Sequence, residues 1–153
     1  MGEFDELESK TCLSDSKWVP EYNIKAGDFL FSRANTIELV GACVIAKHVT
    51  KPLMLSDKIL RFVLSDLLPK EWVLAVLRSW WGRHEIERLA TGNQESMRNI
   101  GQDRIRQIRI PIPPTLECGR VIDSIDASMT SAQLVEGHFS HKSVGRTACA
   151  NPS

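Results

Sequence analysis

The side chains best suited to chemistry in this chain lie between Gly92 and Pro114. The first half of this stretch is rich in amide, hydroxyl and guanidinium groups, at Asn93, Gln94, Ser96, Arg98 and Asn99. Arginine can bond a guanine edge in two places, and asparagine or glutamine can bond an adenine edge. Arg104 and Arg106, which follow, suit contacts with phosphates. Taken alone, the stretch has an ordinary solvated loop as its alternative interpretation.

A second polar element lies between two apolar runs, in the stretch from Ile24 to Lys47. A Gly-Asp turn and a predicted strand precede the residues Ser-Arg-Ala-Asn, and a second predicted strand follows them. Arg33 and Asn35 in this element repeat the guanidinium and amide chemistry of the first stretch. For Arg33 a structural role, tying two strand ends together, is the alternative. We call residues 32–35 the first motif and residues 92–99 the second motif.

The two motifs in this order resemble the target-recognition domain of type I restriction–modification specificity subunits. The order is Gly-Asp-apolar-Leu-Phe-Ser-Arg-Ala-Asn, then Leu-Val-Gly, a long gap, a glycine followed after six residues by Asn-Ile, and apolar-Pro-Ile-Pro-Pro. The resemblance covers roughly Asn23 to Gln133. It implies a subunit that reads a split site in double-stranded DNA and does no chemistry itself.

The resemblance also assigns roles to residues, partners and cofactors. The implied DNA-binding residues are Arg33, Asn35, Gln94, Ser96, Arg98 and Asn99, with Arg104 and Arg106 on phosphates. The implied partners are a methyltransferase subunit and, through it, a restriction subunit. S-adenosylmethionine, ATP and Mg would belong to those partners, and this chain would bind none of them. A protein-interaction remnant that no longer reads DNA is the alternative function.

The chain departs from the family pattern in two ways. Cys118 stands after Glu117 where the family usually has glutamine. The usual opening of the recognition domain, a tryptophan-containing segment and several strands, is not visible. In the family that this chain resembles, a whole specificity subunit has two recognition domains separated by two long helices. We therefore expect a truncated fragment of such a subunit, with a tail that a frameshift would explain.

Composition fits a soluble globular chain of one domain. The 153 residues are 42% hydrophobic and 25% charged, and the formal net charge is zero. Zero net charge argues against binding of nucleic acid by bulk charge alone. Residues 98–109 nevertheless hold four arginines against Asp103 alone, a local basic patch for which chance clustering on a solvated face is the alternative. No metal-spaced cysteine pair, signal segment or membrane-length apolar run is present, so a cytoplasmic protein is expected.

The sequence lacks the motifs of enzymes that act on DNA. Ile112 precedes the proline pair, so the Asn/Asp-Pro-Pro-aromatic motif of methyltransferases is absent. No glycine-rich cofactor loop and no Gly-x-x-x-x-Gly-Lys-Ser/Thr phosphate loop occurs. Isolated acids such as Asp28 and Asp57 are interpreted as turn residues, and His138 and His141 as part of a polar tail. We predict no catalytic residue and no metal site.

The elements that must position both motifs are predicted to form an α/β (α+β) domain with a small mixed or antiparallel sheet. Runs of β-branched and aromatic residues predict strands near Phe29–Arg33, Leu39–His48, Ile59–Leu64 and Ile105–Ile110. Apolar residues at helical spacing predict helices near Pro69–Trp80 and Arg83–Ala90, interrupted at Gly82. Trp72, Trp80 and Trp81 are assigned to the core, with one ring at a rim. Gly41 indicates a bulge or a close approach.

A further helix is predicted from Thr115, after the proline pair. Ile122, Ile125 and Met129 recur at steps of three and four residues, as in a coiled-coil seam. We expect this stripe to dock on another helix, from a homodimer or a second specificity half; a helix folded back onto its own core is the alternative. The predicted organisation is an irregular segment (1–22), a partial recognition domain (23–114), the start of a helical region (115–137) and a disordered tail (138–153).

Overall fold

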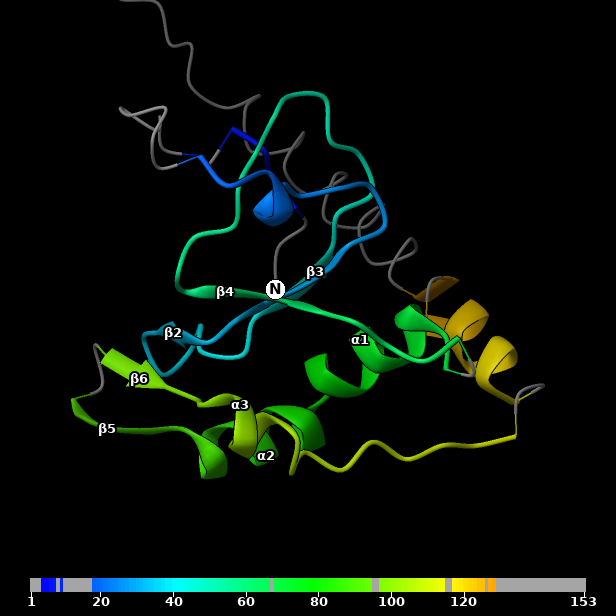
Figure 1. The fold of residues 1–153 in the computed structure, drawn as a ribbon. Helices are drawn as coiled ribbons and strands as arrows, with labels where there is room; N and C mark the ends of the chain where they lie inside the picture. The colour runs from blue at the N-terminus through cyan, green and yellow to red at the C-terminus, as the bar shows by residue number, and fades with distance from the viewer. Residues whose placement is uncertain are drawn as a thin grey trace, which may run out of the picture. The chain divides into compact units, whose positions relative to one another are not determined.

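The strands form two antiparallel sheets of three strands each, with the orders β3-β1-β4 and β2-β6-β5 (Figure 1). The computed structural model describes residues 4–7, 9, 18–66, 68–94, 97–114, 117–125 and 127–128, without the side chains of residues 93 and 94. The chain divides into two units, Met1–Ile112 and Pro113–Ser153. The named elements are η2 (Pro20–Tyr22), β1 (Phe29–Ser32), β2 (Ala34–Asn35), β3 (Cys43–Ile45), β4 (Ile59–Phe62), α1 (Lys70–Arg78), α2 (Trp80–Leu89), β5 (Thr91–Gln94), β6 (Met97–Asn99) and α3 (Gln102–Ile105).

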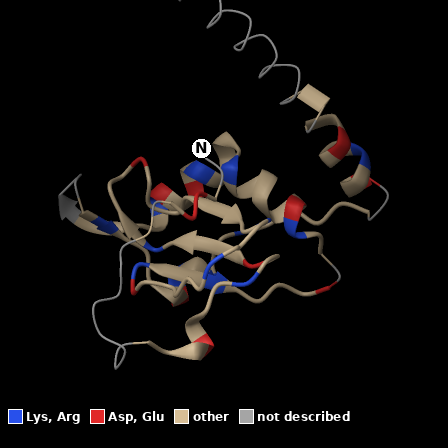
Figure 2. Ribbon diagram, turned by 90° about the horizontal axis from the view of Figure 1, so that it is seen from above, with Lys and Arg blue, Asp and Glu red and all other residues tan. Residues whose placement is uncertain are grey.

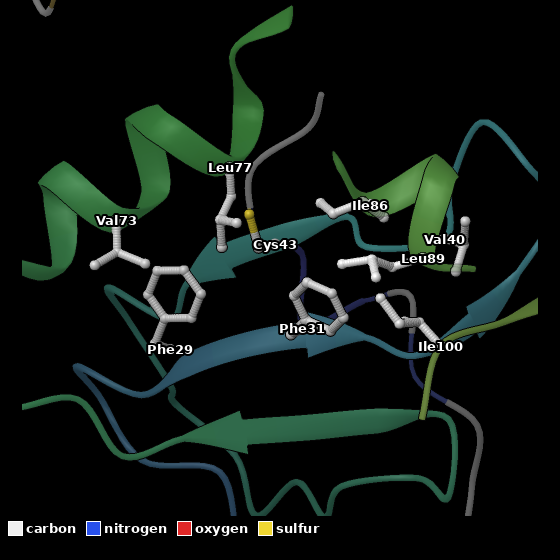
Figure 3. Close-up of a cluster of buried hydrophobic side chains, with 9 residues drawn as sticks. All are labelled: Phe29, Phe31, Val40, Cys43, Val73, Leu77, Ile86, Leu89 and Ile100. Atoms are coloured by element: carbon white, nitrogen blue, oxygen red, sulfur yellow. The ribbon is translucent and has the colours of Figure 1, made fainter. Parts of the chain in front are cut away.

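The first sheet carries the hydrophobic core on the face that α1 and α2 cover. Alternation along β1 places Phe29 and Phe31 on this face, where both rings stack on Phe62 of β4, with centroids 5.6 and 4.9 Å apart. Figure 3 shows both phenylalanines pointing from β1 toward the two helices. The other buried members of the cluster are Val40, Cys43, Val73, Leu77, Ile86, Leu89 and Ile100. The predicted mixture of helices and small antiparallel sheets is confirmed.

Helices α1 and α2 are separated at Ser79 and not at Gly82, where the sequence predicted the interruption. The Ser79 hydroxyl accepts a hydrogen bond from the Gly82 N–H (3.2 Å) and thereby caps α2. Gly82 lies in the first turn of α2, where an added Cβ would lie 2.1 Å from the Val76 carbonyl oxygen. The glycine is therefore required by the close approach of the two helices, and the break comes from the cap.

Strand β3 is much shorter than the predicted strand from Leu39 to His48. Residues 37–41 form turns, in which the Val40 N–H donates to the Thr36 carbonyl (2.8 Å). The Arg83 side chain donates to the carbonyl oxygens of Val40 (2.7 Å) and Ile37 (3.2 Å). Gly41 has φ +76°, and an added Cβ would lie 2.5 Å from the Ile86 side chain. The predicted close approach at Gly41 is thus confirmed, and it is this approach that brings α2 against the sheet.

The predicted strand from Ile105 to Ile110 is wrong. Residues 102–105 form the short helix α3, closed by hydrogen bonds such as Ile105 N–H to the Gly101 carbonyl (3.0 Å). Residues 108–114 have no regular structure, and no described strand pairs with them. Ile108 and Ile110 nevertheless pack against the core while Arg109 is exposed. The alternation therefore reports the burial of every second residue and not membership of a sheet.

The tryptophans are not part of the buried core, contrary to the assignment from helical spacing. Trp80 is 80% exposed and stacks on His84, and Trp81 is 37% exposed. Trp72 is half-buried and donates its indole N–H to the Pro111 carbonyl (2.7 Å). Smaller residues of α1, Val73 and Leu77, face the sheet in their place. The narrow space between helix and sheet is filled by phenylalanines from β1, so the indoles lie at its margin.

The second unit contains helical residues at 117–125 and 127–128. Ile122 is half-buried and Ile125 is 39% exposed, whereas Met129 lies outside the described residues. Docking of this stripe on another helix stays a prediction. Within the described residues, no helix has the length and apolarity needed to cross a bilayer.

Candidate nucleic-acid interface

The two polar motifs, distant in sequence, lie side by side in the second sheet. In the β2–β6 ladder Ala34 pairs with Asn99, and Asn35 pairs with Arg98. Strand β5 pairs on the other side of β6, so the second motif is a hairpin and not the polar loop that the sequence predicted (Figure 1). A polar segment with little apolar content becomes a strand here because β2 supplies a partner for its backbone. The structure thus brings Asn35 of the first motif onto one small sheet with Gln94, Arg98 and Asn99 of the second.

Arg33 joins the two sheets through its backbone. Its N–H donates to the Lys58 carbonyl oxygen (2.8 Å) at the end of the first sheet, and its own carbonyl accepts from the Ile100 N–H (2.9 Å) after β6. Ile100 is fully buried and fixes the second sheet to the core. The Arg33 side chain is half-buried and makes no hydrogen bond or ion pair with any described residue. The backbone therefore provides the tie between strand ends, and the guanidinium remains available for another role.

Asn35 and Arg98 form a cross-strand pair on one face of the second sheet, because residues directly opposite in a ladder share a face. Both are half-buried. The Asn35 Oδ1 accepts from the Thr36 N–H (2.9 Å), which orients the amide and leaves its two N–H donors unused by that contact. The Arg98 Nε is buried and has no hydrogen-bond partner. A buried donor without a partner lowers the free energy of unfolding by about 1–3 kcal/mol. The sheet therefore holds the Arg98 side chain in this position at a cost in stability.

The opposite face of the second sheet carries Met97 and Asn99, both of them exposed. Gly92 has φ +128°, and an added Cβ would lie 2.5 Å from the Met97 carbonyl oxygen, so the hairpin strands approach closely there. Gln94 pairs with Met97 through the backbone, but its side chain and all of Ser96 lie outside the described residues. The predicted readers therefore divide between two faces of one ribbon, with Asn99 opposite to Asn35 and Arg98.

The two arginines predicted to contact phosphates lie on and just after α3. The Arg104 Nη1 donates to the Leu89 carbonyl (3.2 Å) at the last residue of α2. That contact ties α3 to α2 and satisfies a helix-end carbonyl. The Arg106 Nη1 lies 3.1 Å from Asp103 Oδ1, with side chains 73% and 95% exposed. An ion pair with such exposed side chains is weak. Arg106 can therefore exchange Asp103 for another anion.

Charge is mixed over the described chain. Figure 2 shows lysine and arginine positions interspersed with aspartate and glutamate positions along the ribbon. The arginines of the predicted basic patch belong to different segments, namely Arg98 on β6, Arg104 on α3, and Arg106 and Arg109 after it. Among the described residues there is no group of three or more histidine, cysteine or acidic side chains arranged to hold a metal ion. Any binding of nucleic acid must therefore use specific contacts and not a general positive field.

Comparison with known proteins supports the family resemblance. The chain is 32% identical over 148 residues to the type I restriction enzyme EcoEI specificity subunit of Escherichia coli. This chain is homologous to part of a type I specificity subunit. The match covers 90% of the chain and 25% of the relative, so the chain spans about a quarter of that specificity subunit's length. No protein-family model matches the chain.

One group near the two motifs was missed by sequence reasoning. The turn before β4 brings Lys58 next to Arg33, and Lys58 and Asn35 both line a groove of about 1060 Å³. The groove runs over the face of the first sheet that carries Leu30 and Val44, opposite to the helices. No pattern around Lys58 in the sequence marks it, because its neighbourhood is created by the pairing of β1 with β4.

Proposed function

We propose that this chain is a DNA-recognition segment of a type I specificity subunit and that it reads bases without catalysing a reaction. The observation that carries the proposal is the pairing of β2 with β6, which brings Asn35 and Arg98 together on one face. Amide and guanidinium groups held on paired strands have the chemistry that reads adenine and guanine edges in the major groove. The relative's name, a specificity subunit, supports the same role and assigns no catalytic step to this chain.

Within this proposal the residues divide by the kind of contact they make. Base readers are Asn35, Arg98, Asn99 and Gln94, together with Ser96 and with Arg33 at the junction of the sheets. Arg106, exposed and weakly paired, is the stronger candidate of the two for a phosphate contact. Arg104 contacts phosphate only with those donors that its bond to the Leu89 carbonyl leaves free.

The proposed partners are double-stranded DNA and the other subunits of a type I complex. A methyltransferase subunit would bind this subunit directly, and a restriction subunit would join through it. S-adenosylmethionine, ATP and Mg would be held by those partners. Ile122, Ile125 and Met129 would contact a helix of a second copy or of a second specificity half. Because the substrate is the DNA of the cell, a cytoplasmic location belongs to the same proposal.

Selection from a random duplex library tests the reading function. The purified chain, alone and with a methyltransferase subunit, is expected to enrich duplexes that carry the same bases at a few positions. Gln94→Ala should change the preference at one position and should not weaken all sequences alike. A library without enrichment, together with retained binding to the partner subunit, would indicate a protein-interaction remnant that does not read DNA.

The partner helix is tested separately, by changing Ile125 and Met129 to Lys. The double variant should lose oligomers or subunit binding, measured by light scattering, while the circular dichroism of the domain is unchanged. Loss of the entire fold, in a protein whose parent forms no oligomer, would instead show a helix folded back onto its own core.

A further inference from the structure

Two basic residues stand opposite each other where the first sheet ends. The last paired residues of β1 and β4 are Ser32 and Ile59, and the next residues along the two strands are Arg33 and Lys58. The hydrogen bond from the Arg33 N–H to the Lys58 carbonyl (2.8 Å) shows that the backbones remain adjacent. Opposed residues of neighbouring strands have Cα atoms roughly 5 Å apart. The two positive side chains therefore start from adjacent backbone positions.

Neither of these cations is neutralised by the described part of the protein. The ion pairs there are Arg61–Asp28, Arg83–Glu87, Arg88–Glu85 and Arg106–Asp103. Lys58 is exposed, and Asp57 beside it in the sequence pairs with neither cation. Like charges placed opposite each other on paired strands are destabilising unless an anion lies between them. The arrangement thus has the character of an anion site.

The backbone around Lys58 is fixed before any ligand arrives. A turn precedes β4, in which the Ile59 N–H donates to the Ser56 carbonyl (3.1 Å), and the Lys58 carbonyl is held by Arg33. A lysine on a fixed backbone loses less conformational freedom on binding than one on a loose loop. Lysine also suits phosphate, which it meets as a compact point charge.

The site adjoins the residues proposed to read bases. Asn35 follows Arg33 by two positions, pairs with Arg98, and lines the same groove as Lys58. The groove also holds Lys51 and the acids Asp5, Glu6 and Asp57. Glu6 binds the Thr50 N–H (2.9 Å), next to Lys51, so the negative charge at that position offsets Lys51. Lys58 is the groove lysine that shares its neighbourhood with the motif residues.

We propose that Lys58, beside Arg33, contacts a DNA phosphate and so fixes the position of the backbone relative to the bases read by Asn35 and Arg98. The inference rests on the proposed DNA-recognition function and adds a contact outside both motifs. Phosphate contacts set the register of a protein on the duplex but carry no sequence information. Lys58 therefore contributes affinity and salt dependence and leaves base preference unchanged.

The test compares Lys58→Ala with two matched variants, by anisotropy of fluorescent duplexes of several sequences over a series of KCl concentrations. Loss of one phosphate contact should make the negative slope of log affinity against log salt shallower by about 0.9. At physiological salt this change corresponds to binding that is about fivefold weaker. The weakening should be equal for all duplexes. Lys58→Arg, which keeps the charge, should bind like the parent. Lys47→Ala removes the same charge from an exposed lysine outside the groove and should have little effect.

The outcomes separate this inference from the function it rests on. If the parent binds DNA and Lys58→Ala keeps its slope and affinity, the phosphate contact is refuted and DNA recognition stands. Equal losses in Lys58→Ala and Lys47→Ala would show a bulk charge effect and would also refute the contact. A parent chain with no salt-dependent binding, alone or with its methyltransferase subunit, would overturn both. Circular dichroism of each variant excludes unfolding as the cause.

Discussion

The two sheets of the first unit differ in what holds them together. Every residue of β1, the central strand of the first sheet, is buried, and both of its phenylalanines face the helices. In the second sheet no described side chain of β2 or β6 is fully buried. The second sheet depends instead on the pairing of its short strands, on the Arg33 backbone and on the buried Ile100.

This difference separates stability from recognition. Burial of apolar area stabilises the first sheet, at about 25 cal/mol per Å² removed from water, whereas a short polar hairpin alone is marginal. Side chains of the second sheet can therefore change without loss of the fold, which is what the proposed DNA-reading role would require. Changes in the first sheet should destroy both properties together.

The largest expected effect is that of Phe31→Ala, which removes a ring from the centre of the core. The loss should be about 3–5 kcal/mol in the free energy of unfolding, measured by urea titration. Cys43 gives a second readout, because it pairs with Phe31, and burial raises the pKa of its thiol to about 11. Alkylation of Cys43 should be slow in the parent and fast in the variant. Val63→Ala, at a 93% exposed position just beyond β4, should change stability by less than about 0.5 kcal/mol.

Gly82→Ala should come next, because it forces apart the two helices that cover the first sheet. The new Cβ would meet backbone atoms, the Val76 carbonyl oxygen at 2.1 Å and the Leu77 Cα at 2.7 Å, and neither can rotate away. We expect a loss of about 1–3 kcal/mol, as for overpacked cores, seen as a lower melting temperature. Gly119→Ala, with no atom within 4 Å of the new Cβ, is the control and should not lower it. Equal melting temperatures for Gly82→Ala and the parent would refute the close approach.

Arg98→Ala tests the second sheet and should weaken DNA binding without lowering stability. DNA affinity should fall by about 1–3 kcal/mol and base preference should relax at one position, as for loss of a base contact. Stability should not fall and should rise by up to about 1–3 kcal/mol, because the variant removes a buried Nε donor that has no hydrogen-bond partner. Affinity is measured by anisotropy on the selected duplex, and stability by urea titration. Arg88→Ala, an exposed helical arginine paired with Glu85, is the matched control. Loss of stability without loss of binding would make Arg98 a structural residue.

Trp80→Ala should have the smallest effect, although it removes the largest apolar side chain. The indole is 80% exposed and touches His84, so its removal should change the free energy of unfolding by less than about 0.5 kcal/mol. Leu77→Ala, near the end of α1 and 2% exposed, should cost about 2–5 kcal/mol. A large decrease in the free energy of unfolding from Trp80→Ala would show that this ring belongs to the core, and would contradict the separation of core and surface residues in α1 and α2.

The sequence alone determined the elements whose residues agree locally. Apolar spacing predicted α1 and α2, and β-branched or aromatic runs predicted β1 and β4, within a few residues of their observed ends. The two motifs predicted a resemblance to type I specificity subunits, and the chain is 32% identical to part of one such subunit. These inferences succeeded because propensity, periodicity and side-chain chemistry act over short stretches of chain.

Tertiary structure decided what local patterns could not. The alternation from Ile105 to Ile110 looked like a strand, but no described strand pairs with it, and residues 102–105 form the short helix α3. The polar second motif looked like a loop, but β2 pairs with it and makes it a strand. Helical spacing assigned the tryptophans to the core, yet phenylalanines from the sheet already fill that space.

The candidate site shows the same division. Side-chain type was enough to nominate Asn35 and Arg98, because base edges require amide and guanidinium groups. Their placement opposite each other depends on Arg33, which bonds one sheet through its N–H and the other through its carbonyl. Lys58 enters the same neighbourhood only through the pairing of β1 with β4. A single sequence shows which groups are available, whereas contacts between distant strands decide which of them meet.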